Sequence, residues 1–167
     1  MGGPPLSWPG NVTFGWEPVR TIYAEPNFRD LLQEHWEGLA VHKDEMPLDP
    51  DFDRFAQLED MGIFKVWAAR SANGMLVGYF GLFIQPHIHY KTTLTAVEDL
   101  YLLSAPYRRG MTGFRFFKTA IAALKELGVK RVILHDKVHF AADRGTLGRF
   151  FERLGFEHTD RLWSRML

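Results

Sequence analysis

The segment Val97–Gly113, with the sequence VEDLYLLSAPYRRGMTG, combines the features of a strand, a tight turn and the start of a helix. The first N–H groups of a helix have no partner within the helix, and they lie at the positive end of its dipole. Arg108 and Arg109 add positive charge beside that end, and Gly110 and Gly113 allow a close approach to the backbone. This turn is therefore predicted to bind an anion, and a diphosphate group fits its chemistry. Many strand-to-helix turns contain Gly and Arg without binding a ligand, so a purely structural role is the alternative.

The spacing of the glycines separates this turn from two common nucleotide-binding motifs. The turn contains neither G-x-x-x-x-G-K-[ST] nor G-x-G-x-x-G. The sequence therefore argues against the usual NTP-binding loop and the usual dinucleotide-binding loop at this position.

Apolar periodicity and cap residues predict further elements on both sides of this segment. Ser71–Gly74 contains an Asn-Gly pair between two strand-like runs, which is a strong hairpin signal. Asn27 and Asp51 are expected to be helix N-caps. Helices are expected over residues 28–39, 52–61, 113–127 and 146–154, and loops over residues 42–51 and 86–93. Strands are expected over Trp16–Tyr23, Ile63–Arg70, Met75–Gln85, Thr95–Leu103, Val129–Asp136, Phe156–Thr159 and Leu162–Met166.

Length and composition are those of a globular protein. The chain has 167 residues, of which 46% are hydrophobic and 24% charged. We predict an irregular N-terminal arm over residues 1–16 and a single domain over residues 17–167. The absence of cysteine excludes a disulfide scaffold, a cysteine zinc site and a thiol nucleophile. No apolar run approaches the ~18 residues of a membrane span, and the N-terminus lacks signal-peptide features, so we expect a cytoplasmic protein without membrane contact.

The net charge of zero conceals an uneven distribution along the chain. Residues 1–103 contain 7 Lys and Arg against 14 Asp and Glu, whereas residues 104–167 contain 13 against 6. The basic half suits a phosphorylated ligand, and the acidic half suits a cationic one. The loop over residues 42–51 carries four of the acids; Glu37, Asp44 and Glu45 could recognise a cation, and a solvated acidic loop is the alternative. Pairing of the two halves across the fold is the alternative explanation.

Two motifs together resemble a known family. Tyr107–Gly113 has the pattern Y-R-x-G-x-x-G between a strand and a helix, and Arg149–Glu157 has the sequence RFFERLGFE. The first resembles the pyrophosphate-binding turn of the GNAT superfamily of acyl-CoA-dependent N-acyltransferases, and the second resembles the C-terminal helix and strand of that family. The resemblance covers residues 17–167 and is strongest to GNAT-type proteins of tailed phages and prophages.

The resemblance implies a fold and an activity. The fold is α/β, with an α+β mixed and mostly antiparallel sheet of about six to seven strands, about four helices and splayed central strands. The activity is transfer of an acetyl group from acetyl-CoA to a primary amine, which is a small amine, a lysine side chain or a protein N-terminus. The alternatives are a catalytically silent binding protein and, least favoured, an acyltransferase associated with nucleic acid. Family members often form homodimers, and a phage protein would act in the cytoplasm of a bacterial host.

The resemblance also assigns the cofactor site. The backbone of Leu102 and Leu103 would pair with the pantetheine arm of acetyl-CoA. Phe151 stands at the cofactor site where the family often has a tyrosine as general acid, and phenylalanine has no proton to donate. Tyr90, Tyr101 or His139 would then replace it, or the thiolate would leave unaided. The diphosphate would be held by backbone N–H groups of Arg108, Arg109, Gly110, Met111, Thr112, Gly113 and Phe114.

Candidate catalytic residues lie on the central strand and on the loop before it. The family often uses an acid on this strand as a general base, and Glu98 and Asp99 both qualify. Strand residues alternate between faces, so only one of them is expected to face the cleft, with Asp99 slightly favoured. His87, His89 and Tyr90 are expected near the acceptor, where a histidine could act as base or proton relay. No metal site is predicted, because two histidines without a third spaced ligand are weak evidence.

Overall fold

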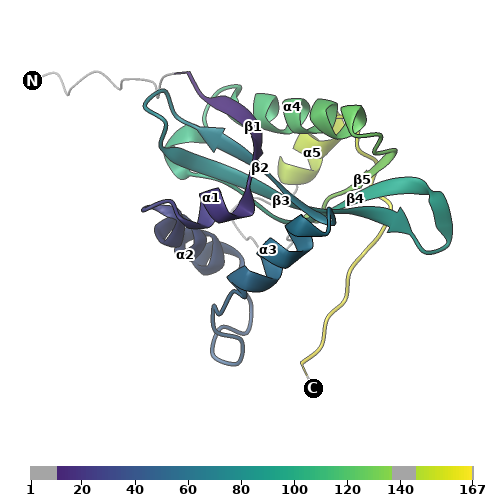
Figure 1. Cartoon of the computed structure of the whole chain (residues 1–167), viewed down its shortest axis with the longest axis horizontal. Coiled ribbons are helices and arrows are strands. Elements are labelled where there is room, and N and C mark those ends of the chain that lie inside the picture. Colours follow the sequence, from purple (N-terminus) through teal and green to yellow (C-terminus); the bar gives the residue numbers. More distant parts are fainter. Residues whose placement is uncertain (1–10, 137–145, 167) are drawn as a thin grey trace, which may run out of the picture. The chain divides into compact units, whose positions relative to one another are not determined.

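We describe residues 11–136 and 146–166 of a computed structural model. The chain divides into two compact units, one up to His135 and one from Asp136 onward, and each is described by itself. None of the helices in the described ranges is long and apolar enough to cross a membrane. The elements in chain order are β1 (Thr13–Glu17), α1 (Val19–Tyr23), α2 (Phe28–Leu39), α3 (Phe52–Asp60), β2 (Phe64–Arg70), β3 (Leu76–His87), β4 (Tyr90–Leu103), η1 (Ala105–Tyr107), α4 (Thr112–Glu126), β5 (Arg131–Ile133) and α5 (Thr146–Arg153) (Figure 1).

The first unit is built on a five-stranded sheet in the order β1-β2-β3-β4-β5. The first three pairings are antiparallel, and the pairing of β4 with β5 is parallel. The expected α+β mixed sheet is therefore confirmed, with five strands in the described residues instead of six to seven. The described residues form five α-helices, four of them in the first unit, where about four were expected.

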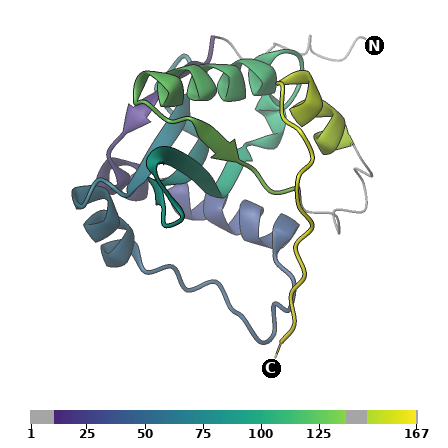
Figure 2. The same cartoon turned by 90° about the vertical axis from the view of Figure 1, so that its right-hand side faces the viewer.

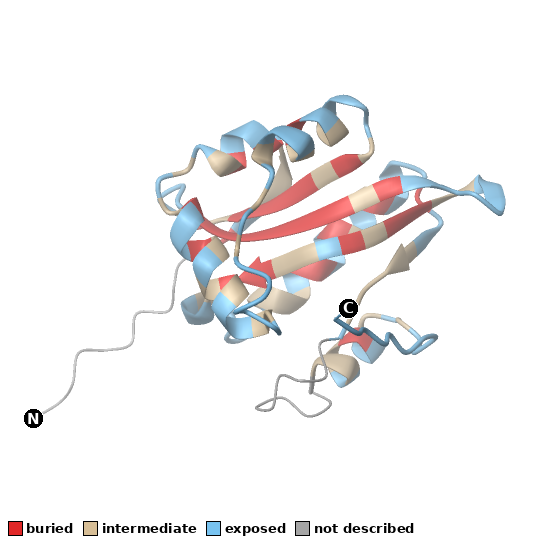
Figure 3. Ribbon diagram, turned by 90° about the horizontal axis from the view of Figure 1, so that it is seen from below, coloured by how far each residue is buried: buried red, intermediate tan, exposed pale blue. Residues whose placement is uncertain are grey.

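Helices cover both faces of the sheet (Figure 1). On one face, α4 packs Phe116 and Phe117 against Phe80 of β3, with ring centroids 6.4 and 5.3 Å from it. On the other face, buried residues of α1, α2 and α3 form a core with Tyr79 and residues of β2. Buried residues run through the middle of the central strands, whereas the far end of the β3–β4 hairpin is exposed (Figure 3). Tyr79 and Phe80, which are neighbours on β3, thus contribute to two separate cores on opposite faces of the sheet.

The start of the sheet differs from the prediction. The strand expected over Trp16–Tyr23 is wrong, because β1 ends at Glu17 and a short helix, α1, follows Pro18. Proline fixes φ near −65° and suits the position before a helix. The carboxylate of Glu59 on α3 accepts the Val19 N–H through both oxygens, at 2.9 and 3.0 Å. This long-range cap holds α1 against α3, and β1 begins at Thr13, inside the segment expected to be an irregular arm.

The first of the two hairpins lies where the local sequence predicts it, whereas the second replaces a predicted loop. In the first, the Gly74 N–H donates to the Ser71 carbonyl at 2.8 Å, and Gly74 has a φ of +83°, which glycine adopts most easily. In the second, the loop expected over residues 86–93 is wrong, because β3 runs to His87 and β4 begins at Tyr90. Pro86 sits at a register shift, where the ladder does not need its missing N–H.

The second unit contains α5, which begins and ends close to the predicted limits. Its Gly155 has a φ of +89°, consistent with the predicted helix end. The two strands expected over 156–159 and 162–166 are wrong, because this segment runs as extended chain without strand pairing (Figure 2). Nearly all of its residues are exposed, so it lacks the buried face that fixes a strand in a sheet.

One arginine joins three separate segments beside the first core. Arg70 at the end of β2 donates to both oxygens of Glu17, at 2.9 and 2.5 Å, and to Glu25 between α1 and α2 at 2.6 Å. It also donates to the Gly74 carbonyl in the hairpin turn at 3.1 Å. The hydrogen bond with Glu17 is the main reason that the pKa of Arg70 lies above its ordinary value.

Replacing Arg70 with methionine is expected to lower the free energy of unfolding by about 2 kcal/mol, because two shielded carboxylates lose their counter-charge. The side chains of Glu17 and Glu25 are only 22% and 23% exposed. Urea titration measures this loss. The control is Arg20→Met, which breaks a pair with Asp60 whose side chains are 60% and 61% exposed, and it should leave stability nearly unchanged. Equal losses in both variants would contradict the role assigned to Arg70.

Candidate functional site

The backbone pairing of β4 with β5 covers only part of β4. The parallel pairing with β5 consists of Thr95, Ala96 and Val97 opposite residues 131–133. Beyond Val97, β4 continues for six residues to Leu103, and within residues 11–136 and 146–166 this part of β4 pairs with β3 alone. In the described residues, the backbone pairing of β4 with β5 therefore ends at Val97. The expected splay of the central strands stays a prediction.

A β-bulge lies where this described pairing ends. Glu98 pairs with Leu82 and Leu100 pairs with Gly81, so Asp99 is an extra residue on β4. A bulge redirects side chains, and such irregularities are common beside functional sites. Strict alternation would place Asp99 and Leu100 on opposite faces, yet both line the same pocket.

Glu98 and Asp99 consequently have different surroundings. The Glu98 side chain is 4% exposed and accepts from the His135 backbone N–H at 3.2 Å, with His135 Nδ1 at 2.6 Å. The Tyr101 hydroxyl donates to the His135 carbonyl at 3.1 Å. Side chains of β4 thus hold the chain just after β5, where the backbone ladder has ended. Asp99, in contrast, is exposed to solvent and lines the pocket.

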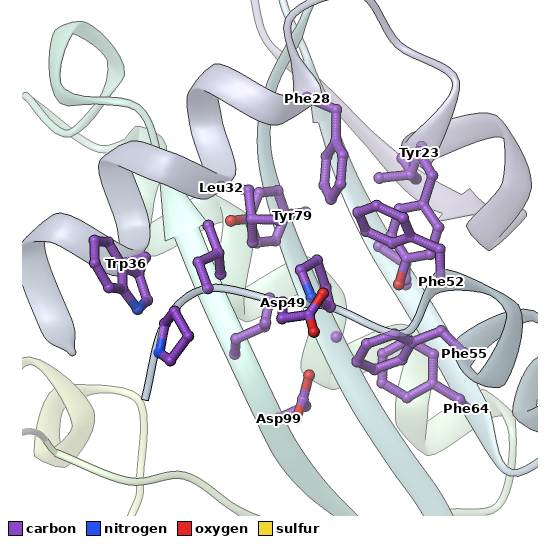
Figure 4. A pocket seen from close by; sticks show the side chains of 17 residues that line it. Tyr23, Phe28, Leu32, Trp36, Asp49, Phe52, Phe55, Phe64, Tyr79 and Asp99 are labelled. Atoms are coloured by element: carbon purple, nitrogen blue, oxygen red, sulfur yellow. The ribbon is translucent and has the colours of Figure 1, made fainter. Parts of the chain in front are cut away.

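The pocket lies on the face of the sheet that carries α1, α2 and α3. It has a volume of about 300 Å³, at the small end of the range for ligand pockets. Figure 4 shows aromatic rings on both sides and the side chains of Asp49 and Asp99 extending toward each other. Its lining is Ile22, Tyr23, Phe28, Leu32, Trp36, Pro47, Leu48, Asp49, Pro50, Phe52, Phe55, Phe64, Val66, Tyr79, Gly81, Asp99 and Leu100.

The electrostatic environment of the pocket is negative. Burial raises the pKa of Tyr23 above its ordinary value, and the charges of Asp99 and Glu59 raise it further. Burial also raises the pKa of Tyr79, followed by the charge of Glu34 and smaller effects that include Asp99. Negative charge opposes ionisation of a phenol, so both tyrosines stay neutral at physiological pH. The Tyr79 hydroxyl lies 3.1 Å from Nδ1 of the buried His35 on α2.

The predicted anion-binding turn connects β4 to α4. Gly110 has a φ of +67°, and α4 begins two residues later at Thr112. The first-turn N–H groups of Thr112, Gly113 and Phe114 have no acceptor within the helix. A Cβ atom added at Gly113 would meet no atom within 4 Å, so space is open at the start of the helix.

Other residues of this turn are partly engaged by the protein itself. The Arg108 side chain donates to the Leu103 carbonyl at 2.5 Å and to Glu34 at 2.8 Å, and its N–H donates to Ala105 at 3.3 Å. Met111, the N-cap residue, is 61% exposed. The Arg108 guanidinium therefore braces the turn against α2, and the open N–H groups belong to the residues that follow.

The remaining predicted site residues lie elsewhere. His87, His89 and Tyr90 stack at the exposed tip of the β3–β4 hairpin, with ring centroids of His87 5.5 and 5.2 Å from the other two, and they do not line the pocket. Phe151 belongs to the second unit, where it is 7% exposed and its ring lies 5.8 Å from that of Phe156. His139 lies outside the described residues.

Several pocket residues were not singled out from the sequence. Asp49 stands in the loop predicted over residues 42–51, and only the cluster of acids in that loop pointed toward a cation. Tyr23 was assigned to a strand, so its place on α1 could not be anticipated. The helical spacing of Phe52 and Phe55 predicts core residues in preference to ligand-binding ones, yet both line the pocket.

Comparison with known proteins gives a family and a fold. A sequence model described as the Acetyltransferase (GNAT) family matches residues 20–156. No curated protein matches the sequence. Among solved structures, glucosamine-6-phosphate N-acetyltransferase from Arabidopsis thaliana has a TM-score of 0.67 at 16% identity, covering 94% of this chain and 99% of that one. An aminoglycoside acetyltransferase from an uncultured soil metagenomic sample has a TM-score of 0.64 at 17% identity, covering 93% and 97%. AAC(6')-Iy, solved with a bisubstrate analogue of CoA, has a TM-score of 0.60 at 14% identity, covering 95% and 99%.

Proposed function

Because the chain belongs to the GNAT family of acetyltransferases, we propose that it transfers an acetyl group from acetyl-CoA to a primary amine. One observation carries this proposal. In the described residues, the pairing of β4 with β5 ends at Val97, and Asp99, two residues further along β4, lines the pocket. A donor held along β4 beyond Val97 would reach an amine held in the pocket.

The residues of the first unit fit acetyl-CoA in two places. The diphosphate would be held by the turn Arg108–Phe114, where helix N–H groups are available and Gly113 leaves open space. The pantetheine arm would pair with the backbone of Leu102 and Leu103, on the part of β4 that β5 does not cover. Side chains matter little for this kind of binding, so Met111 at the helix start is compatible with it.

The two neighbouring acids of β4, Glu98 and Asp99, have different proposed roles. When bound, acetyl-CoA supplies the thioester whose C–S bond breaks as the amine forms its N–C bond. An ammonium group cannot attack, so Asp99 accepts its proton at a carboxylate oxygen, directly or through water. Glu98 is a positioning residue, because it holds His135 and not the pocket. Tyr101, whose hydroxyl donates to the His135 carbonyl at 3.1 Å, is the proposed proton donor in place of Phe151.

Calorimetric titration with acetyl-CoA tests the donor site. We expect one-to-one binding with a Kd in the micromolar range, about −8 kcal/mol, for both acetyl-CoA and CoA. ATP, which lacks the pantetheine arm, should not bind measurably. Binding without turnover of any amine would favour the catalytically silent alternative, and no binding to the folded protein would refute the donor site. The phage-type origin, the cytoplasmic location and the homodimer remain predictions.

A further inference from the structure

Resting on the proposed function, we infer that the acceptor is a small primary amine with one aromatic or bulky apolar body, bound in the pocket beside Asp99. The amine would lie toward the two carboxylates and the apolar body among the rings (Figure 4). Three properties of the pocket support this substrate class: its aromatic walls, its two carboxylates and its volume.

The walls of the pocket are mainly aromatic. Three rings form one wall, because Tyr23 lies 5.0 Å from Phe28 and 4.5 Å from Phe52 between centroids. Phe55 and Phe64 form another contact at 4.9 Å, and Trp36 closes a further side from α2. Aromatic walls favour flat or bulky apolar groups through burial and ring contacts.

The polar groups of the lining side chains are few, and the two charged ones are both carboxylates. Asp49 comes from the loop before α3 and Asp99 from β4, so two separate segments bring carboxylates to one opening. A buried cation needs such a partner, because an unpaired charge is costly to remove from water. The Lys43 ammonium lies on Trp36, 5.3 Å from the ring centroid, and donates to the Glu37 carbonyl at 2.7 Å. This lysine is thus engaged by its own helix–loop region.

Size and polarity argue against a sugar acceptor. The volume of about 300 Å³ suits a molecule with one ring better than a di- or trisaccharide. Each hydroxyl of a sugar needs a hydrogen-bond partner when buried. The lining side chains offer only the two carboxylates, the hydroxyls of Tyr23 and Tyr79 and the Trp36 indole N–H. A phosphorylated sugar would in addition place its anion beside Asp49 and Asp99.

The test is steady-state acetylation of three amines by the full chain: 2-phenylethylamine, ethanolamine and glucosamine 6-phosphate. We expect kcat/KM for 2-phenylethylamine to exceed that for ethanolamine at least 100-fold, and no turnover of the sugar phosphate. Comparable turnover of either polar amine would overturn the inference while leaving the acetyltransferase function intact. If acetyl-CoA binds but no amine is acetylated, the proposed function fails. In that case, saturation-transfer NMR measures directly whether 2-phenylethylamine binds to the protein. Binding would support the inference about the pocket, and absence of binding would overturn it.

Two matched variants of one loop locate the charge recognition. Asp49→Asn should raise KM for 2-phenylethylamine at least tenfold and change kcat less than twofold. Asp44→Asn removes an exposed acid of the same loop that does not line the pocket, and it should change neither constant. Competitive inhibition by 2-phenylethanol, a neutral analogue, should be the same in Asp49→Asn and the parent protein. The role of Asp49 would be overturned if the two substitutions changed KM equally. It would also be overturned if Asp49→Asn weakened inhibition by 2-phenylethanol as much as it raised KM for 2-phenylethylamine.

Discussion

Replacing Gly113 with glutamate is expected to weaken acetyl-CoA binding at least 100-fold, which corresponds to about 2.7 kcal/mol. The new side chain would occupy the open space at the first turn of α4, where no atom lies within 4 Å of an added Cβ. Its negative charge would also use the helix N–H groups that are proposed to hold the diphosphate. Calorimetric titration of the variant measures the loss directly.

The fold of this variant should remain intact. A glutamate in the first turn of a helix is favourable to the helix itself, so the urea midpoint should be unchanged or slightly higher. The matched control is Ala122→Glu, which adds the same charge at an exposed position nine residues further along α4. It should bind acetyl-CoA as the parent protein does. Unchanged affinity in Gly113→Glu would show that the donor does not use this turn.

Replacing Asp99 with asparagine is expected to lower kcat roughly 100-fold or more, the usual contribution of a general base. Asparagine has nearly the same shape but cannot accept the proton of the ammonium group. The loss should shrink as pH rises toward the pKa of the amine, about 10 for an alkylamine such as lysine, because more of the amine is then already neutral. Initial rates across this pH range measure both effects.

Glu98→Gln is the comparison for Asp99→Asn, because the two acids are neighbours on β4. The amide oxygen of glutamine can still accept the His135 N–H, which the Glu98 carboxylate now accepts at 3.2 Å. We expect a kcat within tenfold of the parent value and no recovery with rising pH. If both substitutions reduce kcat equally and neither loss depends on pH, neither residue is the base.

Local sequence rules predicted the elements that depend on local contacts. The helix after Asp51 begins where its side chain accepts the Arg54 N–H at 2.8 Å, as the N-cap rule requires. The hairpin at Ser71–Gly74 and the helix after the anion-binding turn also lie close to their expected positions. Asn27 precedes α2 as expected, but its amide donates to the Leu76 carbonyl on β3 and does not cap the helix.

Features that depend on distant contacts were not predictable. α1 has only five residues, and its first N–H group is capped by Glu59, forty residues later in the chain. Because that contact is distant in sequence, the local pattern of these five residues did not predict a helix. Which of Glu98 and Asp99 faces the pocket depends on the bulge in β4. The alternation of side chains along a regular strand does not reveal where such an extra residue is inserted. The pocket itself combines α1, α2, α3 and three strands, and the approach of Asp49 to Asp99 has no signature in the sequence between them.

Because Asp99 is the extra residue of the β4 bulge, the proposed general base could be gained or lost without a change in the strand pairing. If Asp99 alone were deleted, Glu98 would still stand opposite Leu82 and Leu100 opposite Gly81, so the ladder would become continuous. Leu100 would keep its face, because its partner on β3 is the same. Under the proposed mechanism, loss of this one codon would remove the general base and lower kcat as Asp99→Asn does, within the same architecture, and its insertion would reverse that change. Fast and slow lineages of such a fold can therefore be separated by a single in-frame event.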